Sequence, residues 1–309
     1  MEFFHRETKF DFMGIRKWTA LLSTVVMVVC LGLLFVKGLN FGLDFTGGTQ
    51  LELRYEKPVN FEEVREQLDK AGLTGAKVTQ YGSARDILVK ISNRAGVSEQ
   101  QLGQLVLNAL KVHQDKVELR RIEFVGAEVG ENLAEQGTLA VVVALLAMML
   151  YIAVRFEYRF GVSAAVALMH DPILILGIFS FFQFDFDLAV LAGILAVIGY
   201  SLNDTIVIYD RVRENFRKVR KGTPKEIMNL SINQTLSRTI MTSSLTLIVV
   251  LALYFIGGES LRGFSLALII GIIVGTYSSI FVSGALALSM GLSRADLVPS
   301  SKKVADEMP

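Results

Sequence analysis

Cysteine, proline and tryptophan are scarce in this chain, and neither sign of charge dominates it. A single cysteine, Cys30, excludes an internal disulfide, and the three histidines have no neighbours at metal-ligand spacing. The formal net charge of +1 gives no basic signal for nucleic acid. The sequence also lacks a phosphate-binding loop, a dinucleotide-binding glycine pattern and an ordered nucleophile–His–Asp set. We therefore expect a protein that is not an enzyme and that carries no metal or cofactor.

Apolar residues, in contrast, are abundant. They make up 52% of the 309 residues, the mean hydropathy is +0.47, and charged residues still account for 20%. This balance is too apolar for a soluble domain and too charged for membrane spans alone, so it predicts several transmembrane helices and one soluble domain. The apolar runs predict six spanning helices, at residues 18–36, 138–154, 161–183, 188–209, 236–256 and 263–290.

Residues 38–137 have the composition of a soluble domain with a linker. Alternating apolar residues predict strands at 49–55, 77–81, 87–91 and 117–125, and helical periodicity predicts helices at 61–71 and 98–113, capped by Asn60 and Ser98. The resulting β-α-β-β-α-β order is typical of a small α+β ferredoxin-like domain. Because many proteins share this fold, it indicates no particular activity.

The distribution of lysine and arginine predicts the orientation. Basic residues gather in the N-terminal segment 1–17, the loop 210–235 and the tail 291–309, so these segments are expected in the cytoplasm. Six spans then place both termini in the cytoplasm and residues 38–137 on the opposite side, in a multi-pass membrane protein.

Asp204 is the most conspicuous ionisable residue within the apolar runs. It follows Asn203 in the fourth predicted span, about 9 Å from the end that Asp210 marks. A carboxyl group at that depth is costly and indicates a functional site with a partner. Arg238 in the fifth span is the candidate partner, since it lies at a similar depth on a helix face rich in Ser and Thr that includes Thr242.

Other polar features accompany this pair. His170 and Asp171 lie near the middle of the third predicted span, beside Pro172, and Gly47 and Gly48 end the segment that leads from the first span into the soluble domain. The carboxyl and the arginine could form a proton relay or a static ion pair, or Arg238 could extend to the membrane surface. The hydroxyl face and the His-Asp pair could equally be contacts between helices, and the glycines could form a turn or a hinge.

Five motifs resemble those of the SecF members of the SecD/SecF family, within the RND superfamily. They are GLDFTGGTQLEL from Gly42, EFVGAEVGENL from Glu123, HDP from His170, GYSLNDTIVIYDRVREN from Gly199 and NQTLSRTIMTS from Asn233. The resemblance implies half of an RND-type membrane core, completed by SecD. It implies that Asp204 and Arg238 belong to a proton pathway, with Asn203, Asp171, His170 and Thr242 as further candidates.

The function implied by the resemblance is protein export. A SecD–SecF complex would use the proton-motive force to help preproteins finish crossing at the SecYEG translocon, with YajC and YidC as further possible partners. Two alternatives stay open from the residues alone: a proton-driven transporter of small molecules, and an assembly subunit whose buried charges are only structural.

Overall fold

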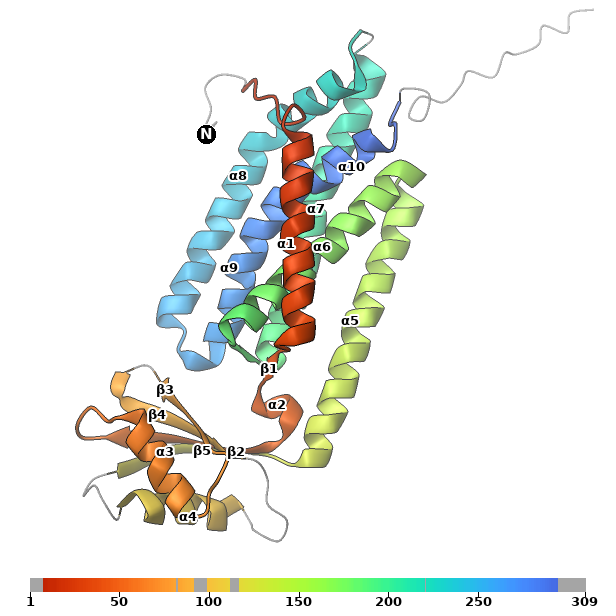
Figure 1. The fold of residues 1–309 in the computed structure, drawn as a ribbon. Coiled ribbons are helices and arrows are strands. Elements are labelled where there is room, and N and C mark those ends of the chain that lie inside the picture. The colour runs from red at the N-terminus through yellow and green to blue at the C-terminus, as the bar shows by residue number, and fades with distance from the viewer. Residues whose placement is uncertain (1–7, 82, 92–98, 112–116, 220, 294–309) are drawn as a thin grey trace, which may run out of the picture.

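The computed structural model describes residues 8–81, 83–91, 99–111, 117–219 and 221–293. A bundle of long helices carries a small sheet domain at one end, and the described N- and C-terminal ends lie at the other (Figure 1). Ser98, predicted to cap a helix, and residues 1–7 and 294–309 of the predicted cytoplasmic termini lie outside these ranges.

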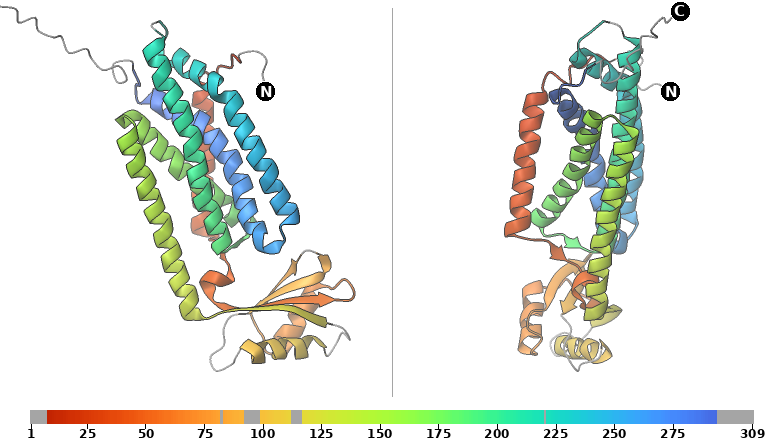
Figure 2. Two further views of the ribbon diagram at one scale, coloured as in Figure 1. Left: turned by 180° about the vertical axis from the view of Figure 1, so that it is seen from behind. Right: turned by 90° about the vertical axis from the view of Figure 1, so that its right-hand side faces the viewer.

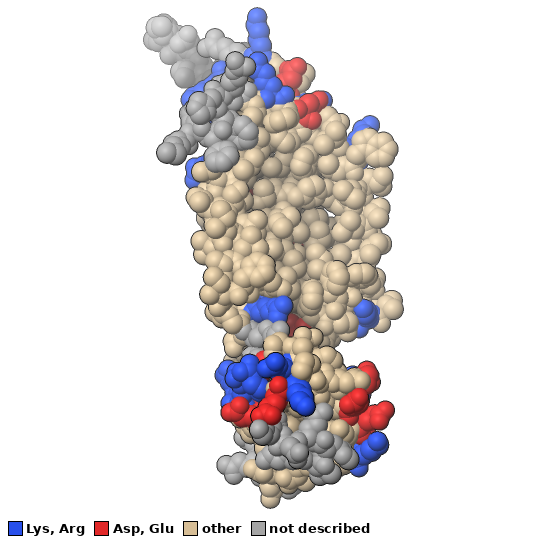
Figure 3. Space-filling model, turned by 90° about the vertical axis from the view of Figure 1, so that its left-hand side faces the viewer, with Lys and Arg blue, Asp and Glu red and all other residues tan. Residues whose placement is uncertain are grey.

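Within the described ranges, six helical segments are long and apolar enough to cross a membrane. They are α1 (Arg16–Val36), α5 (Ala127–Arg155), α6 (Tyr158–Phe182), α7 (Leu188–Lys218), α8 (Pro224–Ile256) and a sixth made of α9 (Arg262–Tyr277), the π-helical η2 (Ser278–Val282) and α10 (Ser283–Ser289). The short 3-10 helix η1 (Glu259–Leu261) connects α8 to α9. Figure 3 shows a broad band without charged side chains between two charged ends, as expected for a membrane protein.

Two predicted boundaries were wrong. Helix α5 begins at Ala127 rather than at residue 138, and most of the predicted loop 210–235 is helical, because α7 runs to Lys218 and α8 starts at Pro224. Apolar runs mark only the part of a helix that lies in lipid, whereas polar residues extend the same helices beyond it. At the start of α8, Thr223 and Glu226 form a reciprocal capping box.

Small residues allow the central helices to approach closely. Helix α7 packs against α9, and a Cβ atom added to Gly271 would lie 2.1 Å from a side-chain carbon of Val197. One helical turn further, a Cβ atom on Gly275 would lie 2.9 Å from Cβ of Ser201. Glycine at these positions therefore sets the spacing of the two helices that surround the buried polar groups.

The sheet domain contains two helices and four antiparallel strands in the spatial order β3-β4-β2-β5. Its elements are β2 (Gly48–Tyr55), α3 (Phe61–Lys70), β3 (Lys77–Tyr81), β4 (Ser83–Ile91), α4 (Glu99–Lys111) and β5 (Val117–Val125). All were predicted to within a few residues, and the side chain of Asn60 caps α3 by accepting a hydrogen bond from the Glu62 amide. Alternate strand residues, such as Leu51, Leu53 and Val89, form the apolar core with the helices.

A second, two-stranded sheet joins this domain to the bundle. Strand β1 (Asn40–Phe41) follows α1 and pairs in parallel with β6 (Asp185–Phe186), which lies between α6 and α7. The one-turn helix α2 (Leu43–Thr46) comes next, and the ring of Phe45 stacks on that of Phe186 at 5.7 Å. This junction was not predicted, because two residues are too few for a strand pattern.

Candidate functional site

Asp204 lies on α7 and is buried in the helix bundle. Asp187 caps the start of this helix by accepting a hydrogen bond from the Val190 amide at 2.8 Å. Only 3% of the surface of Asp204 is exposed, and its Oδ2 atom has no hydrogen-bond partner within the described part of the chain. An ionised carboxylate in such a place is costly, whereas a protonated one is much less so. This group is thus suited to taking up and releasing a proton as its surroundings change.

The expected contact between Asp204 and Arg238 is not formed in this structure. No ion pair within 4.0 Å joins the two described side chains, and Arg238 lies on an exposed face of α8, although its charge acts on the carboxyl group through space. Similar depth is not enough for a contact, because the rotation of each helix about its axis decides where its side chains lie. Arg238 is one residue, or about 100°, from Thr239 on the buried face of α8.

Two further candidates, Asn203 and Thr242, differ from Asp204 in their surroundings. Asn203 is exposed, and Thr242 donates to the backbone oxygens of Arg238 and Thr239 on its own helix. The Ser/Thr face does connect helices elsewhere: Tyr200 donates to Ser243 at 3.2 Å, and Ser243 lies 2.8 Å from Thr276 Oγ1. Part of the hydroxyl face therefore joins α7, α8 and α9.

Asp171 is a second buried carboxyl group, and unlike Asp204 it is fully engaged. His170 Nδ1 lies 3.0 Å from Oδ1, within hydrogen-bond distance, and both side chains are almost completely buried. The other oxygen, Oδ2, accepts hydrogen bonds from Ser201 on α7 and, at 2.9 Å, from Ser278. The free ring nitrogen of the histidine, Nε2, is buried and has no partner in the described part of the chain.

Ser278 was missed in the sequence. It begins the π-helical turn η2, which widens the last span and brings its hydroxyl to Asp171, 107 residues away in the chain. The cluster of Ser278, Ser279 and Ser283 within six residues of the last span was the available signal. Ser201 completes the arrangement, because it contacts Asp171 and lies about one helical turn before Asp204. Residues of α6, α7 and η2 thus form a polar site inside the bundle.

Gly47 and Gly48 form the turn between α2 and β2. Both have positive φ angles, +63° and +134°, which side-chain-bearing residues rarely adopt. A Cβ atom on Gly47 would lie 3.0 Å from Cα of Ala127, and one on Gly48 would lie 2.7 Å from the Ile91 oxygen. Both glycines are therefore required by backbone conformation and by close packing against the start of α5 and the end of β4.

Comparison with known protein families gives two matches. Residues 106–293 match the family described as protein export membrane protein SecD/SecF, C-terminal, and residues 32–59 match the SecD/SecF GG motif. The second match contains the turn at Gly47 and Gly48, and the first contains all the buried polar residues described above.

Comparison with individual proteins and solved structures points to the same family. The chain is 49% identical to protein translocase subunit SecF of Vibrio alginolyticus over 98% of both chains, and 47% identical to that of Pseudomonas aeruginosa over 97% of both. A crystal structure of SecDF, a translocon-associated membrane protein from Thermus thermophilus, has a TM-score of 0.84 at 39% identity and covers 92% of this chain. This chain spans only 39% of that longer protein. A second SecDF structure, in a super-membrane-facing form, gives a TM-score of 0.70.

The family match covers more than half of the sequence, and the similarity to the curated relatives extends from end to end. This chain belongs to the SecF family of protein translocase subunits.

Proposed function

We propose that this SecF-family subunit couples proton movement to the late stages of preprotein translocation, as part of the SecD–SecF accessory complex of the Sec translocase. The observation that carries the proposal is the buried Asp204 carboxyl group, with one oxygen unpartnered among the described residues and the charge of Arg238 nearby. A proton moving across the membrane supplies about 2.3 kcal/mol per 100 mV, which is enough to bias a rearrangement of helices. The chain is a transport subunit rather than an enzyme.

The second site supports the same proposal. His170 and Asp171 are joined to α7 through Ser201, which lies about one helical turn from Asp204. A change of protonation at Asp204 would therefore occur close to the contact between α6 and α7. We infer that Asp204 and Arg238 are the titrating and charged elements of the pathway. The His170–Asp171 pair holds α6 against α7 and η2.

SecD is the expected partner. The solved SecDF chain is more than twice as long as this one, and Asn203 and Arg238 are exposed on the isolated bundle, where a second set of helices would cover them. We further propose SecYEG and the translocating preprotein as contacts, with YajC and YidC as additional ones.

We propose that the protein crosses the bacterial inner membrane several times and that both of its termini lie in the cytoplasm. Basic residues gather at the bundle end opposite the sheet domain (Figure 3), in agreement with the positive-inside rule, and six spans return the chain to its starting side. The sheet domain would then be periplasmic. Its element order and its strand order β3-β4-β2-β5 support a ferredoxin-like fold.

Replacing Asp204 with asparagine tests the proton site. We expect Asp204→Asn to abolish the acceleration of precursor release by the proton-motive force in vesicles that contain the complex, whereas Asp204→Glu should retain part of it. An uncoupler should slow release by the wild type to the level of the asparagine variant and should leave that variant unchanged.

Other outcomes separate the alternative functions. Normal, uncoupler-sensitive release by Asp204→Asn would mean that the carboxyl group is only structural. If neither the uncoupler nor the substitution changed precursor release, transport of a small molecule would become the better hypothesis. Purification in mild detergent should yield a larger six-span partner together with this chain.

A further inference from the structure

A cavity of about 420 Å³ lies between the ends of α5 and α7 that are furthest from the sheet domain. Every side chain that lines it is charged. The lining residues are Arg155, Asp210, Arg213, Glu214, Arg217 and Lys218. With four cations and two carboxylates, the lining has a formal charge of 4 − 2 = +2.

The length of α7 places this cavity at the membrane surface. The helix has 31 residues and is therefore about 46 Å long, whereas the hydrocarbon layer is only about 30 Å thick. Since α7 starts at Leu188, its last turns, which contain the lining residues from Asp210 onward, extend into the layer of lipid headgroups. In Figure 2 α7 continues beyond the end of α5.

The carboxylates of the lining are already paired with cations. Arg155 bonds both oxygens of Asp210 at 2.9 Å, and Lys218 donates to Glu214 at 2.6 Å. Arg217 is exposed and forms no ion pair with any residue of the described ranges. Arg213 is paired as well, because it donates to Glu157 at 3.1 Å. Among the lining residues, Arg217 is therefore the cation available to an anion.

An apolar surface adjoins the cavity on its membrane side. Val154 and Leu150 on α5 are 82% and 67% exposed, and Tyr158 at the start of α6 is 77% exposed. The ring of Phe156 lies under the guanidinium groups of both Arg155 and Arg213, at 5.2 and 5.7 Å. A ligand that fits has a negative head in the cavity and a hydrocarbon part along α5.

We propose that this cavity binds the headgroup phosphate of an anionic phospholipid, whose acyl chains lie on the exposed apolar face of α5. A free phosphate ion would use the cations but not the adjoining apolar surface. The basic residues at this end of the bundle would then have a specific ligand in addition to their effect on membrane orientation.

Native mass spectrometry of the full chain in detergent tests the site. With phosphatidylglycerol and phosphatidylcholine supplied in equal amounts, we expect the wild type to retain phosphatidylglycerol selectively. Each surface cation contributes about fivefold to such binding, so Arg217→Gln together with Lys218→Gln should weaken retention about 30-fold. The matched control, Lys221→Gln together with Lys17→Gln, removes two cations that do not line the cavity and should retain the lipid.

Three results would overturn the proposal: equal retention of both lipids, equal loss in the control variant, or displacement of the lipid by millimolar inorganic phosphate. A circular dichroism melt shows whether each variant is folded. Lipid retention is measured without a proton gradient, so Asp204→Asn should retain the lipid as the wild type does. Failure of the lipid site can therefore be distinguished from failure of the proposed proton site.

Discussion

At the scale of single residues, the hydrogen bond from Ser278 to Asp171 is expected to stabilise the folded protein. Hydrogen bonds between membrane helices contribute about 0.6 kcal/mol on average, but a bond to a carboxylate is stronger, at about 1.5–3 kcal/mol. Ser278→Ala removes a donor to the buried Asp171 and should lower the free energy of unfolding by about 1–2 kcal/mol. Thermal unfolding in detergent measures this loss.

Its neighbour Ser279 is the matched control for that substitution. Ser279 is equally buried but donates only to the Thr276 oxygen on its own helix, so Ser279→Ala should change the stability by much less. Equal effects of the two alanine substitutions would show that the contact with Asp171 does not stabilise the fold.

The ion pair between Asp86 and Arg54 predicts that the stability of the sheet domain depends on pH. Hydrogen bonds from Arg54, at 2.7 and 3.0 Å, and then from Ser83 hold the pKa of Asp86 at about 2, below its usual 3.8, although partial burial opposes them. Because the pKa is lower in the folded state, the stabilisation is complete above about pH 4 and is lost as the pH falls to 2.

The effect should appear in the strands that carry the pair. Amide exchange of β2 and β4, corrected for the intrinsic effect of pH, should speed up between pH 4 and pH 2. Asp86→Asn should exchange faster than the wild type at neutral pH and should lose this step. A wild-type domain whose protection was constant down to pH 2 would contradict the role of the ion pair.

At the scale of helices, the crossing of α1 and α6 depends on Gly177. A Cβ atom on this glycine would lie 2.3 Å from Cβ of Cys30, so Gly177→Ala should push α1 away from the bundle. Cys30 is 5% exposed and is the only cysteine in the chain. We expect a small membrane-permeant thiol reagent to label it slowly in the wild type and at least several-fold faster in the variant.

Gly32 provides the comparison for this experiment. It lies on α1, the helix that carries Cys30, and an added Cβ atom would meet nothing within 4 Å. Gly32→Ala should therefore leave the labelling rate of Cys30 unchanged, and an unchanged rate in Gly177→Ala would show that the crossing tolerates the extra carbon.

The helices and strands were largely predictable, and the errors share one cause. Apolar runs located all six spans, and alternation located the strands of the sheet domain, because burial and periodicity are linked locally. Helix ends outside the lipid carry no apolar signal. The start of α8 could still have been found from Thr223, Pro224 and Glu226, which form a capping pattern.

The candidate site was predictable only in part. Asp204, His170 and Asp171 were found because ionisable groups are rare in apolar spans. Ser278 was not, since serine is common in such spans and its contact depends on a π-helical turn. The exposed position of Arg238 depends on how α8 is rotated in the bundle, which sequence spacing alone does not determine.

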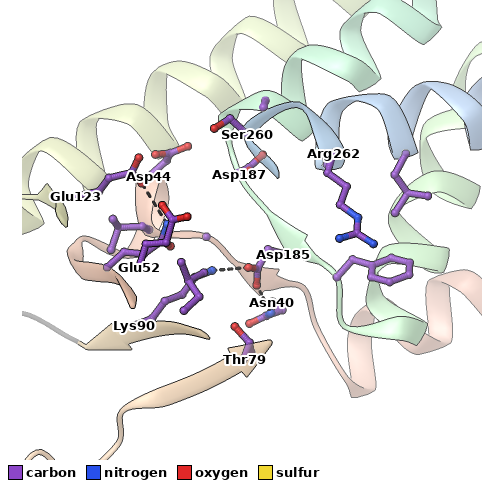
Figure 4. A pocket seen from close by; sticks show the side chains of 18 of the residues that line it. Asn40, Asp44, Glu52, Thr79, Lys90, Glu123, Asp185, Asp187, Ser260 and Arg262 are labelled. Carbon is purple, nitrogen blue, oxygen red and sulfur yellow. Dashed lines mark hydrogen bonds and ion pairs between the residues drawn. The ribbon is translucent and has the colours of Figure 1, made fainter. Parts of the chain in front are cut away.

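At the scale of the whole molecule, an ion pair holds the sheet domain against the helix bundle. Lys90 on β4 bonds Asp185 on β6, and the same carboxylate accepts from Asn40 at 2.6 Å (Figure 4). Lys77 on β3 adds a hydrogen bond to Asn40 at 2.8 Å. Asn40, Lys90 and Asp185 are among the residues that line a cavity of about 620 Å³ between the domain and the bundle.

Reversing one charge of this pair should loosen the domain. Lys90→Asp places a carboxylate beside Asp185, and we expect a broader distribution of distances between spin labels at residues 70 and 255, measured in a Cys30→Ser background. Adding Asp185→Lys should restore the narrow distribution. Lys57→Asp, which reverses an exposed charge away from the junction, should have no effect, and a narrow distribution in Lys90→Asp would exclude the proposed role.

The close approach of Gly47 to Ala127 has a consequence for how such proteins change over time. The chain leaves the bundle at Gly47 and returns at Ala127 through almost the same point, so the intervening domain is an insertion whose two ends meet. One or two residues are enough to bridge that separation. Evolution can therefore enlarge, shorten or exchange the domain without rerouting the chain through the membrane, as long as the glycine turn that brings the ends together is kept.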